Sequence, residues 1–321
     1  MKIGFIGLGN VGGKLAGNLL ANGTDLTVRD LDRANAQPFL DQGAAWADSP
    51  ADMVGLVDLV ITCLPSPAAS AAVMEGADGL LTALGPDKIW AEMSTTDAGE
   101  MTRLADLVTA TGAQDIECHV SGGCHRAATG NISIFAGGDR ATFEAMLPVL
   151  TILGRRVLHT GPIGSASKLK VMTNYLATTH LVALSEALTT MAATGLDLAT
   201  TYEAIRISSG NSFVHETESQ VILNGSRDIS FTMDLVLKDI GLFQSIAEDH
   251  GVPLDLSPML VSLFEQANAA YGPREFSPNI IRRYDEPTGL DIRAPGFPAE
   301  LVDEEPPSRG AEVVPRRSSS A

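Results

Sequence analysis

Cysteine, aromatic residues and positive charge are all scarce in this 321-residue chain. Its three cysteines, Cys63, Cys118 and Cys124, are too few for a disulfide framework, so we expect a reducing compartment, the cytoplasm. Lysine and arginine number 22 against 39 acidic residues, which gives a net charge of −17. Such a surface repels phosphate backbones and anionic lipids, so we expect neither nucleic acid nor membrane as a partner.

Long hydrophobic runs are missing as well. Gly4, Gly7 and Gly9 interrupt the first apolar stretch, so the sequence predicts neither a signal peptide nor a membrane span. Hydrophobic residues nevertheless make up 45% of the chain, which is enough for a sizeable core. The length suits two domains, and we expect a soluble protein.

Short apolar segments alternate with helical ones in the first half of the chain. The apolar segments lie at residues 2–7, 26–29, 59–64, 89–93, 132–136 and 157–159, and a helix is expected at about 11–21. Because parallel strands need crossover connections, this alternation predicts a mostly parallel sheet covered on both faces. We assign residues 1–162 to this α/β Rossmann domain.

The pattern then becomes helical. A long helix is predicted at about 164–194, and further helical segments follow at 198–207, 233–250 and 258–270 with no convincing strand between them. We therefore assign residues 163–275 to an all-α C-terminal domain that the long helix joins to the first domain.

Eight prolines follow Tyr271 and predict a tail, residues 276–321, without regular structure. The part up to Val302 retains apolar residues, and we expect an extended arm packed on a domain or on a partner subunit. Residues 308–321 are expected to be disordered.

A G-x-G-x-x-G motif lies between the first predicted strand and the first predicted helix. Gly7 would make the tight turn, Gly9 would admit a pyrophosphate, and Gly12 would let the helix pack closely on the strand. Asn10 and Val11 lie at the start of the expected helix, whose first N–H groups would face the phosphates. The simple alternative is a glycine-rich turn without a ligand.

Asp30 lies 18 residues after Gly12, at the end of the second predicted strand. A carboxylate there accepts hydrogen bonds from ribose hydroxyls and repels a 2′-phosphate, which favours NAD over NADP. Arg29 and Arg33 flank this position and could reach a phosphate, so NADP stays possible.

Leu64 and Pro65 follow one predicted strand, and Thr95 follows another. Parallel strands bring their carboxyl ends to one edge of the sheet, where such folds bind ligands, so we expect these residues in the cofactor site. For Thr95, simple helix capping explains the residue equally well.

Lys170 and Asn174 lie one turn apart on one face of the predicted long helix. A lysine among alanine, leucine, valine and methionine would lose water, which lowers the pKa of its amine toward the range of proton exchange at neutral pH. The alternative is a lysine that extends along the helix to solvent, beside a structural asparagine.

The glycine motif is one of four motifs that follow one another in the sequence. They are Gly4–Gly12, Val120–Gly123 with Gly130 and Ala136–Asp139, Gly161–Gly164 with Lys170 and Asn174, and Lys238-Asp239. In these motifs the chain resembles the β-hydroxyacid dehydrogenases, the 3-hydroxyisobutyrate dehydrogenase family, over about residues 1–275.

The resemblance implies roles for individual residues. Lys170 would be the acid/base that exchanges a proton with the substrate hydroxyl, and Asn174 would orient that group. Ser121, Gly122 and Gly123 would hold the substrate carboxylate with hydroxyl and backbone N–H donors.

Three further positions match the family's binding site. Lys238 would reach both cofactor and substrate, while Asp239 would support its helix. Leu64 and Thr95 match positions that line the cofactor site.

The chain departs from the family pattern just before the Ser-Gly-Gly run. Glu117-Cys118-His119 replaces the usual Asp-Ala-Pro, and His119, His125 and Arg126 crowd the loop expected to meet the substrate. The choice of substrate is therefore left open.

Four residues in this region could also ligate zinc, namely Cys118, His119, Cys124 and His125. Their spacing does not match the usual paired-ligand sites, and the loop between them already has a role in the resemblance. We therefore expect no metal.

The sequence thus predicts an NAD-preferring dehydrogenase of CH–OH groups that interconverts a short 3-hydroxy acid, such as 3-hydroxyisobutyrate, and its semialdehyde, with Lys170 as acid/base. The alternatives are a reductase of a more polar semialdehyde, of the tartronate, succinate or sulfolactaldehyde type, and a non-catalytic dinucleotide-binding protein. A homodimer or homotetramer is expected from the resemblance and because long helices need burial.

Overall fold

The computed structural model describes residues 1–316, which fold as two compact units. The first unit comprises residues 1–170 together with the C-terminal segment from Asp303, and the second comprises Val171–Val302. This division falls inside the long helix at Lys170, eight residues later than the boundary expected at 162, and it splits the expected tail between the two units. Among residues 1–316, no helix is both long and apolar enough to cross a membrane.

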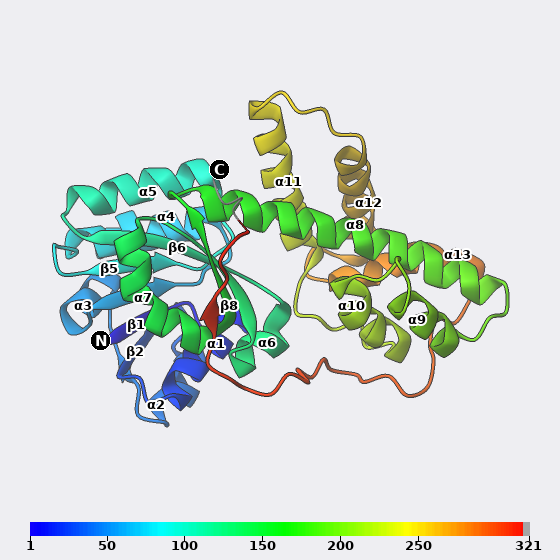
Figure 1. Cartoon of the computed structure of the whole chain (residues 1–321), viewed down its shortest axis with the longest axis horizontal. Helices are drawn as coiled ribbons and strands as arrows, with labels where there is room; N and C mark the ends of the chain where they lie inside the picture. Colours follow the sequence, from blue (N-terminus) through cyan, green and yellow to red (C-terminus); the bar gives the residue numbers. More distant parts are fainter. Residues whose placement is uncertain (317–321) are drawn as a thin grey trace. The chain divides into compact units, whose positions relative to one another are not determined.

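Within these residues, the strands of the first unit form one nine-stranded sheet in the order β3-β2-β1-β4-β5-β6-β7-β8-β9 (Figure 1). All neighbours are parallel except β6 and β7. The strands are β1 Ile3–Ile6, β2 Leu26–Arg29, β3 Ala45–Trp46, β4 Leu59–Thr62, β5 Ile89–Glu92, β6 Gln114–Ser121, β7 Ile132–Gly137, β8 Gly154–Gly161 and β9 Ala311–Glu312.

Helices cover both faces of this sheet, as the alternating pattern predicts. On one face, α1 (Asn10–Ala21) and α7 (Arg140–Leu153) bury side chains such as Leu15 and Phe143. On the other, α3 (Pro50–Leu56), α4 (Pro67–Glu75) and α5 (Ala98–Ala110) bury Met53, Met74 and Met101. The short helices α2 (Gln37–Leu40) and α6 (Gly123–Thr129) complete the unit. The predicted Rossmann domain is confirmed.

The second unit is helical. The long helix α8 (Ser165–Ala193) begins in the first unit and continues into the second, as predicted. The other helices are α9 Leu198–Arg206, α10 Phe213–Asn224, α11 Met233–Asp249, α12 Leu256–Tyr271 and α13 Arg282–Thr288, with a 3₁₀ helix at Ser277–Ile281. Their apolar sides share a core that includes Leu188, Val236 and Phe264.

The expectation of no regular structure after Tyr271 is wrong. The 3₁₀ helix and α13 follow that residue, and Pro287 lies in the last turn of α13. The expectation of disorder from Ser308 is also wrong up to Arg316, because Ala311 and Glu312 pair with β8 as the strand β9. Residues 317–321 lie outside the described residues.

We call residues 303–313 the C-terminal strap. In Figure 1 the end of this segment, drawn in red, runs alongside β8 as β9. The N–H of Gly310 donates to the carbonyl of Thr151 at 2.8 Å, and that of Val313 donates to Val157 at 2.8 Å. A Cβ at Gly310 would lie only 1.9 Å from the carbonyl oxygen of Gly154, so this close approach requires glycine.

Charged contacts hold the strap in place. Asp303, whose side chain is 1% exposed, accepts hydrogen bonds from Thr129 and, at 2.6 Å, from Asn131. Burial works to raise the pKa of Asp303, but these bonds outweigh it and hold that pKa below its usual range. Glu305 lies 3.1 Å from Arg155, and Glu312 lies 2.6 Å from Arg140.

Removal of the strap tests its contribution. We expect a chain that ends at Val302 to melt roughly 5–10 °C below the full chain, because β8 becomes an edge strand and several arginines lose their partners. A chain that ends at Arg316 keeps every strap contact described above and should melt with the full chain. Equal melting temperatures for all three chains, measured by circular dichroism, would contradict this account.

Candidate functional site

The glycine motif forms the predicted turn between β1 and α1. Gly7 has φ +97°, and a Cβ there would lie 2.3 Å from the carbonyl oxygen of Cys63. A Cβ at Gly12 would lie 2.0 Å from the carbonyl oxygen of Gly7, so the helix packs directly on the turn. At Gly9, by contrast, no atom of the described residues other than Gly9 and its neighbours along the chain lies within 4 Å of the Cβ position. The backbone of Gly9 is therefore open to a ligand.

Asp30 lies beside this turn at the end of β2. One of its carboxylate oxygens accepts the N–H of Leu8 at 2.7 Å, and the other accepts the N–H of Asp32 at 3.0 Å and the amide of Asn35 at 3.1 Å. These bonds fix the carboxylate next to the glycine turn, where the ribose position was predicted.

Arg29 and Arg33 both face Trp46. The guanidinium of Arg29 lies 5.8 Å from the centre of the Trp46 ring and donates to the carbonyls of Ala47, at 3.1 Å, and Asp48. The guanidinium of Arg33 lies 4.8 Å from the same ring. Both guanidinium groups thus lie against the Trp46 ring, and this contact disfavours their binding to a 2′-phosphate.

The carboxyl ends of β4 and β5 are joined through Ser94. Its hydroxyl accepts the N–H of Leu64 at 2.6 Å, and its own N–H donates to Glu92 at 2.7 Å. Thr95 follows directly and is partly exposed. The explanation of Thr95 as a helix cap is wrong, because the side chain that caps α5 is that of Asp97. Leu64 and Thr95 therefore lie at one sheet edge, as predicted.

Ser121 ends β6, and two glycines turn the chain into α6. Gly122 has φ +131° and Gly123 has φ +86°, which side-chain-bearing residues rarely adopt. Gly122 precedes the first residue of α6 and accordingly has no side chain to cap it. The next turn of α6 carries Arg126, which lies 3.5 Å from Glu305 of the C-terminal strap.

Sequence reasoning missed β6 itself, and with it the role of Glu117. The Glu117 side chain is fully buried and accepts the N–H groups of Ala166, at 2.8 Å, and Ser167, at 3.1 Å, in the first turn of α8. His119 is also buried, 3.0 Å from Glu117 and 2.8 Å from the Ser167 hydroxyl. The expectation that His119 crowds the substrate loop is therefore wrong.

Glu92 is the register partner of Glu117 on the neighbouring strand, but its surroundings differ. Burial works to raise the pKa of both carboxyls. For Glu117, hydrogen bonds from His119, Ser167 and Ala166 outweigh burial and hold the pKa below its usual range. For Glu92, the bonds from Ser94 do not offset burial, and the pKa is raised.

The possible zinc ligands do not converge. Among residues 1–316, no three histidine, cysteine, aspartate or glutamate residues are arranged to hold a metal ion. Cys118 packs in the core, and burial, together with the charges of Glu117 and Glu92, raises the pKa of its thiol. Burial and the nearby Arg126 lower the pKa of His125.

Lys170 lies in the first unit and is 8% exposed, while Asn174 lies one turn further along α8 in the second. Within the second unit, the Asn174 amide donates to Asp239 at 2.5 Å, and Lys238 lies 3.2 Å from the same carboxylate. Asp239 is 2% exposed. It therefore does more than support its helix, because it fixes the Asn174 side chain.

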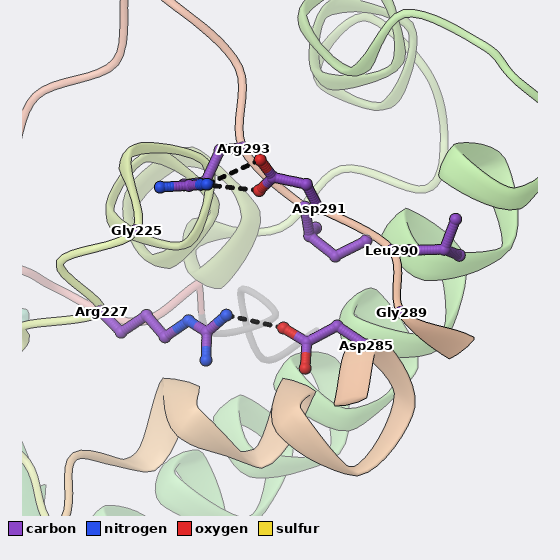
Figure 2. Close-up of a pocket in the computed structure, with 8 residues that line it drawn as sticks. Gly225, Arg227, Asp285, Gly289, Leu290, Asp291 and Arg293 are labelled. Atoms are coloured by element: carbon purple, nitrogen blue, oxygen red, sulfur yellow. Dashed lines mark hydrogen bonds and ion pairs between the residues drawn. The ribbon is translucent and has the colours of Figure 1, made fainter. Parts of the chain in front are cut away.

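The second unit also has a cavity of about 380 Å³ that contains none of the predicted site residues. Figure 2 shows its two arginines, each paired with a carboxylate. Arg227 lies 2.7 Å from Asp285, and Arg293 lies 2.6 Å from Asp291. Because both positive charges are already neutralised, the cavity is not a strong anion site.

Comparison with known proteins decides the family. A family model described as the NAD binding domain of 6-phosphogluconate dehydrogenase matches residues 2–161, and one described as the NAD-binding domain of NADP-dependent 3-hydroxyisobutyrate dehydrogenase matches residues 164–284. The 2-(hydroxymethyl)glutarate dehydrogenase of Eubacterium barkeri is 31% identical over 91% of this chain and 97% of its own. The chain belongs to the β-hydroxyacid dehydrogenase family.

Two further relatives agree with this family. The NAD-dependent L-serine dehydrogenase of Pseudomonas aeruginosa is 31% identical over 89% of this chain and 98% of its own. The crystal structure of a 3-hydroxyisobutyrate dehydrogenase from Salmonella typhimurium superposes with a TM-score of 0.80 at 27% identity, and the match covers 88% of this chain and all of that one. The protein is thus an NAD(P)-dependent hydroxyacid dehydrogenase.

The first unit fits a nicotinamide dinucleotide. The open backbone at Gly9 leaves room for the pyrophosphate, and, in the described part of the chain, no side chain caps the start of α1. The Asp30 carboxylate lies beside the turn, in a place suited to accept hydrogen bonds from a ribose. When bound, NAD or NADP would accept or supply the hydride.

The two register partners Glu92 and Glu117 should respond oppositely to the same substitution. Glu117, with its lowered pKa, stabilises the fold above its unfolded pKa and loses that effect as the pH falls through its folded pKa. Glu92, with its raised pKa, costs stability as the pH rises. At pH 7 we expect Glu117→Gln to lower the melting temperature by roughly 5 °C or more, and Glu92→Gln to leave it unchanged or raise it. Equal losses in thermal melts would contradict this assignment.

Proposed function

We propose that the protein is an NAD-preferring dehydrogenase that interconverts a short 3-hydroxy acid and its semialdehyde. The observation that carries this proposal is Lys170, a buried lysine one turn after the carboxylate-capped start of α8, in the unit that carries the dinucleotide turn. A buried amine beside a cofactor-binding fold suits proton exchange better than it suits packing.

The substrates in the relatives' names share one chemical pattern. 3-Hydroxyisobutyrate, L-serine and 2-(hydroxymethyl)glutarate are all 3-hydroxypropanoates that differ in the group on carbon 2. We therefore infer that this protein acts on a substrate of the form HOCH₂–CH(R)–COO⁻. The group R is not fixed by the residues that bind the shared part.

Each predicted site residue has its own role in this reaction. The Nζ of Lys170 would take the hydroxyl proton during oxidation of the carbon that bears this hydroxyl, and it would return a proton in the reverse direction. Asn174, fixed by Asp239, orients the hydroxyl. Ser121 and the backbone of Gly122 and Gly123 hold the carboxylate.

The remaining predicted site residues bind the cofactor in this proposal. Lys238 contributes positive charge toward cofactor and substrate, and Leu64, Pro65 and Thr95 line the cofactor site. A homodimer or homotetramer and a cytoplasmic location stay predictions.

Substitution of Lys170 tests the proposed chemistry. We expect Lys170→Ala to lower kcat by about 10²–10⁴-fold, because the proton acceptor is lost, with the Kd for NAD unchanged. Lys168→Ala is the matched control, since Lys168 is exposed on the same helix and should be dispensable. Wild-type turnover in the Lys170 variant would refute the mechanism. If the unmodified chain binds NAD but turns over no hydroxy acid, the result would favour the non-catalytic alternative.

Substitution of Asp30 tests the cofactor preference. We expect Asp30→Ser to raise the ratio of kcat/KM for NADP to that for NAD by about 10-fold or more, because the charge that repels a 2′-phosphate is removed. Asp32→Ser is the control, because Asp32 caps the 3₁₀ helix Arg33–Ala36 by accepting the N–H of Ala34 and should not alter the ratio. A preference for NADP in the unmodified chain would overturn the assignment of Asp30.

A further inference from the structure

The helix that carries Lys170 has no cap of its own. Gly164 precedes α8 and accepts the first intrahelical bond, from the N–H of Lys168 at 3.3 Å, yet it has no side chain and has φ +86°. The N–H groups in the first turn of a helix need acceptors from elsewhere. For Ser165 the acceptor is the carbonyl of Pro162, at 3.1 Å.

Glu117 supplies the acceptors for the next two residues from a distant part of the sequence. Its two carboxylate oxygens accept the N–H groups of Ala166 and Ser167 separately, and the Ser167 hydroxyl also donates to it at 2.5 Å. Glu117 thus acts as a cap of α8 delivered from β6, about 50 residues earlier. Its negative charge lies at the positive end of the helix dipole, without competition from water.

His119 contacts both members of this cap, the Glu117 carboxylate and the Ser167 hydroxyl. The ionised carboxylate of Glu117 can only accept, and the Ser167 hydroxyl donates to it, so the Nε2 atom of His119 carries the hydrogen that bonds to these oxygens. The imidazole therefore links β6 to the first turn of α8. All three side chains are buried, which leaves little freedom for this turn.

Lys170 lies three residues after Ser167, on the same side of the helix. A helix moves as a rigid body over one turn, so a displacement of its first turn displaces the Lys170 side chain with it. Both residues belong to the first unit, so the sheet that carries the Ser-Gly-Gly turn also fixes the start of the helix that carries Lys170.

We propose that Glu117 and His119 are positioning residues that set the location of the Lys170 amine through the first turn of α8. This inference rests on the proposed role of Lys170 as acid/base. It also accounts for Glu117-Cys118-His119 in place of the Asp-Ala-Pro pattern of the resemblance. The longer Glu117 side chain and the His119 imidazole together connect β6 to α8. Because Glu117 acts on the position of the Lys170 amine, its replacement should lower kcat more than it changes the KM for substrate or the Kd for NAD.

The first test compares Glu117→Gln and Glu117→Asp at 25 °C. We expect Glu117→Gln to lower kcat by about 10–100-fold, with the Kd for NAD and the KM for substrate within about 2-fold of the unmodified values. Glu117→Asp keeps the charge and should recover much of kcat. Hydrogen exchange should accelerate in Glu117→Gln at residues 165–168. If kcat stays at the unmodified value while exchange at these residues accelerates, the positioning role is refuted.

Asp139→Asn is the matched control. Asp139 caps α7 with the same chemistry, accepting the N–H groups of Ala141 at 2.9 Å and Thr142 at 3.4 Å, but α7 carries no proposed site residue. We expect this variant to melt earlier and to keep its kcat. An equal loss of kcat in Asp139→Asn would show that removal of the charge from any helix cap suffices, which would overturn the specific role of Glu117.

A second test separates this inference from the proposed function. An alkylamine added to Lys170→Ala should restore part of the rate, and the restored rate should be the same in Lys170→Ala/Glu117→Gln, because a free amine does not depend on α8. A lower restored rate in the double variant would show that Glu117 acts by another route. If Lys170→Ala keeps its full activity without amine, the proposed function itself fails, which is a different result.

Discussion

The buried carboxylate of Glu117 at the start of α8 is the interaction on which the arrangement of the proposed site depends. A 29-residue helix that starts after a glycine has no local cap, and the sheet supplies one. Because ionised Glu117 is buried, it must keep these hydrogen bonds, and the bonds in turn hold the helix to β6. Lys170, the proposed acid/base, and the Ser-Gly-Gly turn, the proposed carboxylate site, are thus both attached to one element, β6.

Local patterns predicted most of the fold. The strands β1, β2, β4, β5 and β7 are short apolar runs, since both faces of a parallel sheet are buried. Two of the elements that pattern analysis missed, β6 and α10, share a feature. Each contains a buried histidine with a hydrogen-bond partner: His119 with Glu117, and His215 with Ser219 at 2.9 Å. Because these buried positions are polar, a search for apolar residues does not identify them as buried.

Contacts distant in sequence account for the rest. The glycine turn and Asp30 were predictable because their spacing reflects local geometry, whereas Glu117 meets Ala166 and Ser167 only through the fold. The C-terminal strap was missed for the same reason. Its prolines exclude a regular helix, but two residues, Ala311 and Glu312, suffice to pair with an open sheet edge, and that pairing depends on β8 and on the arginines near it.

A crystal structure of the Glu117→Gln variant with NAD and a 3-hydroxy acid, beside the same complex of the unmodified chain, tests the central claim most directly. In the unmodified complex we predict that the Lys170 Nζ lies within hydrogen-bonding distance of the substrate hydroxyl, with both N–H bonds from α8 to Glu117 intact. In the variant we predict that the first turn of α8 and the Lys170 Nζ shift away from the hydroxyl together. An unchanged Lys170 position in the variant would contradict the account.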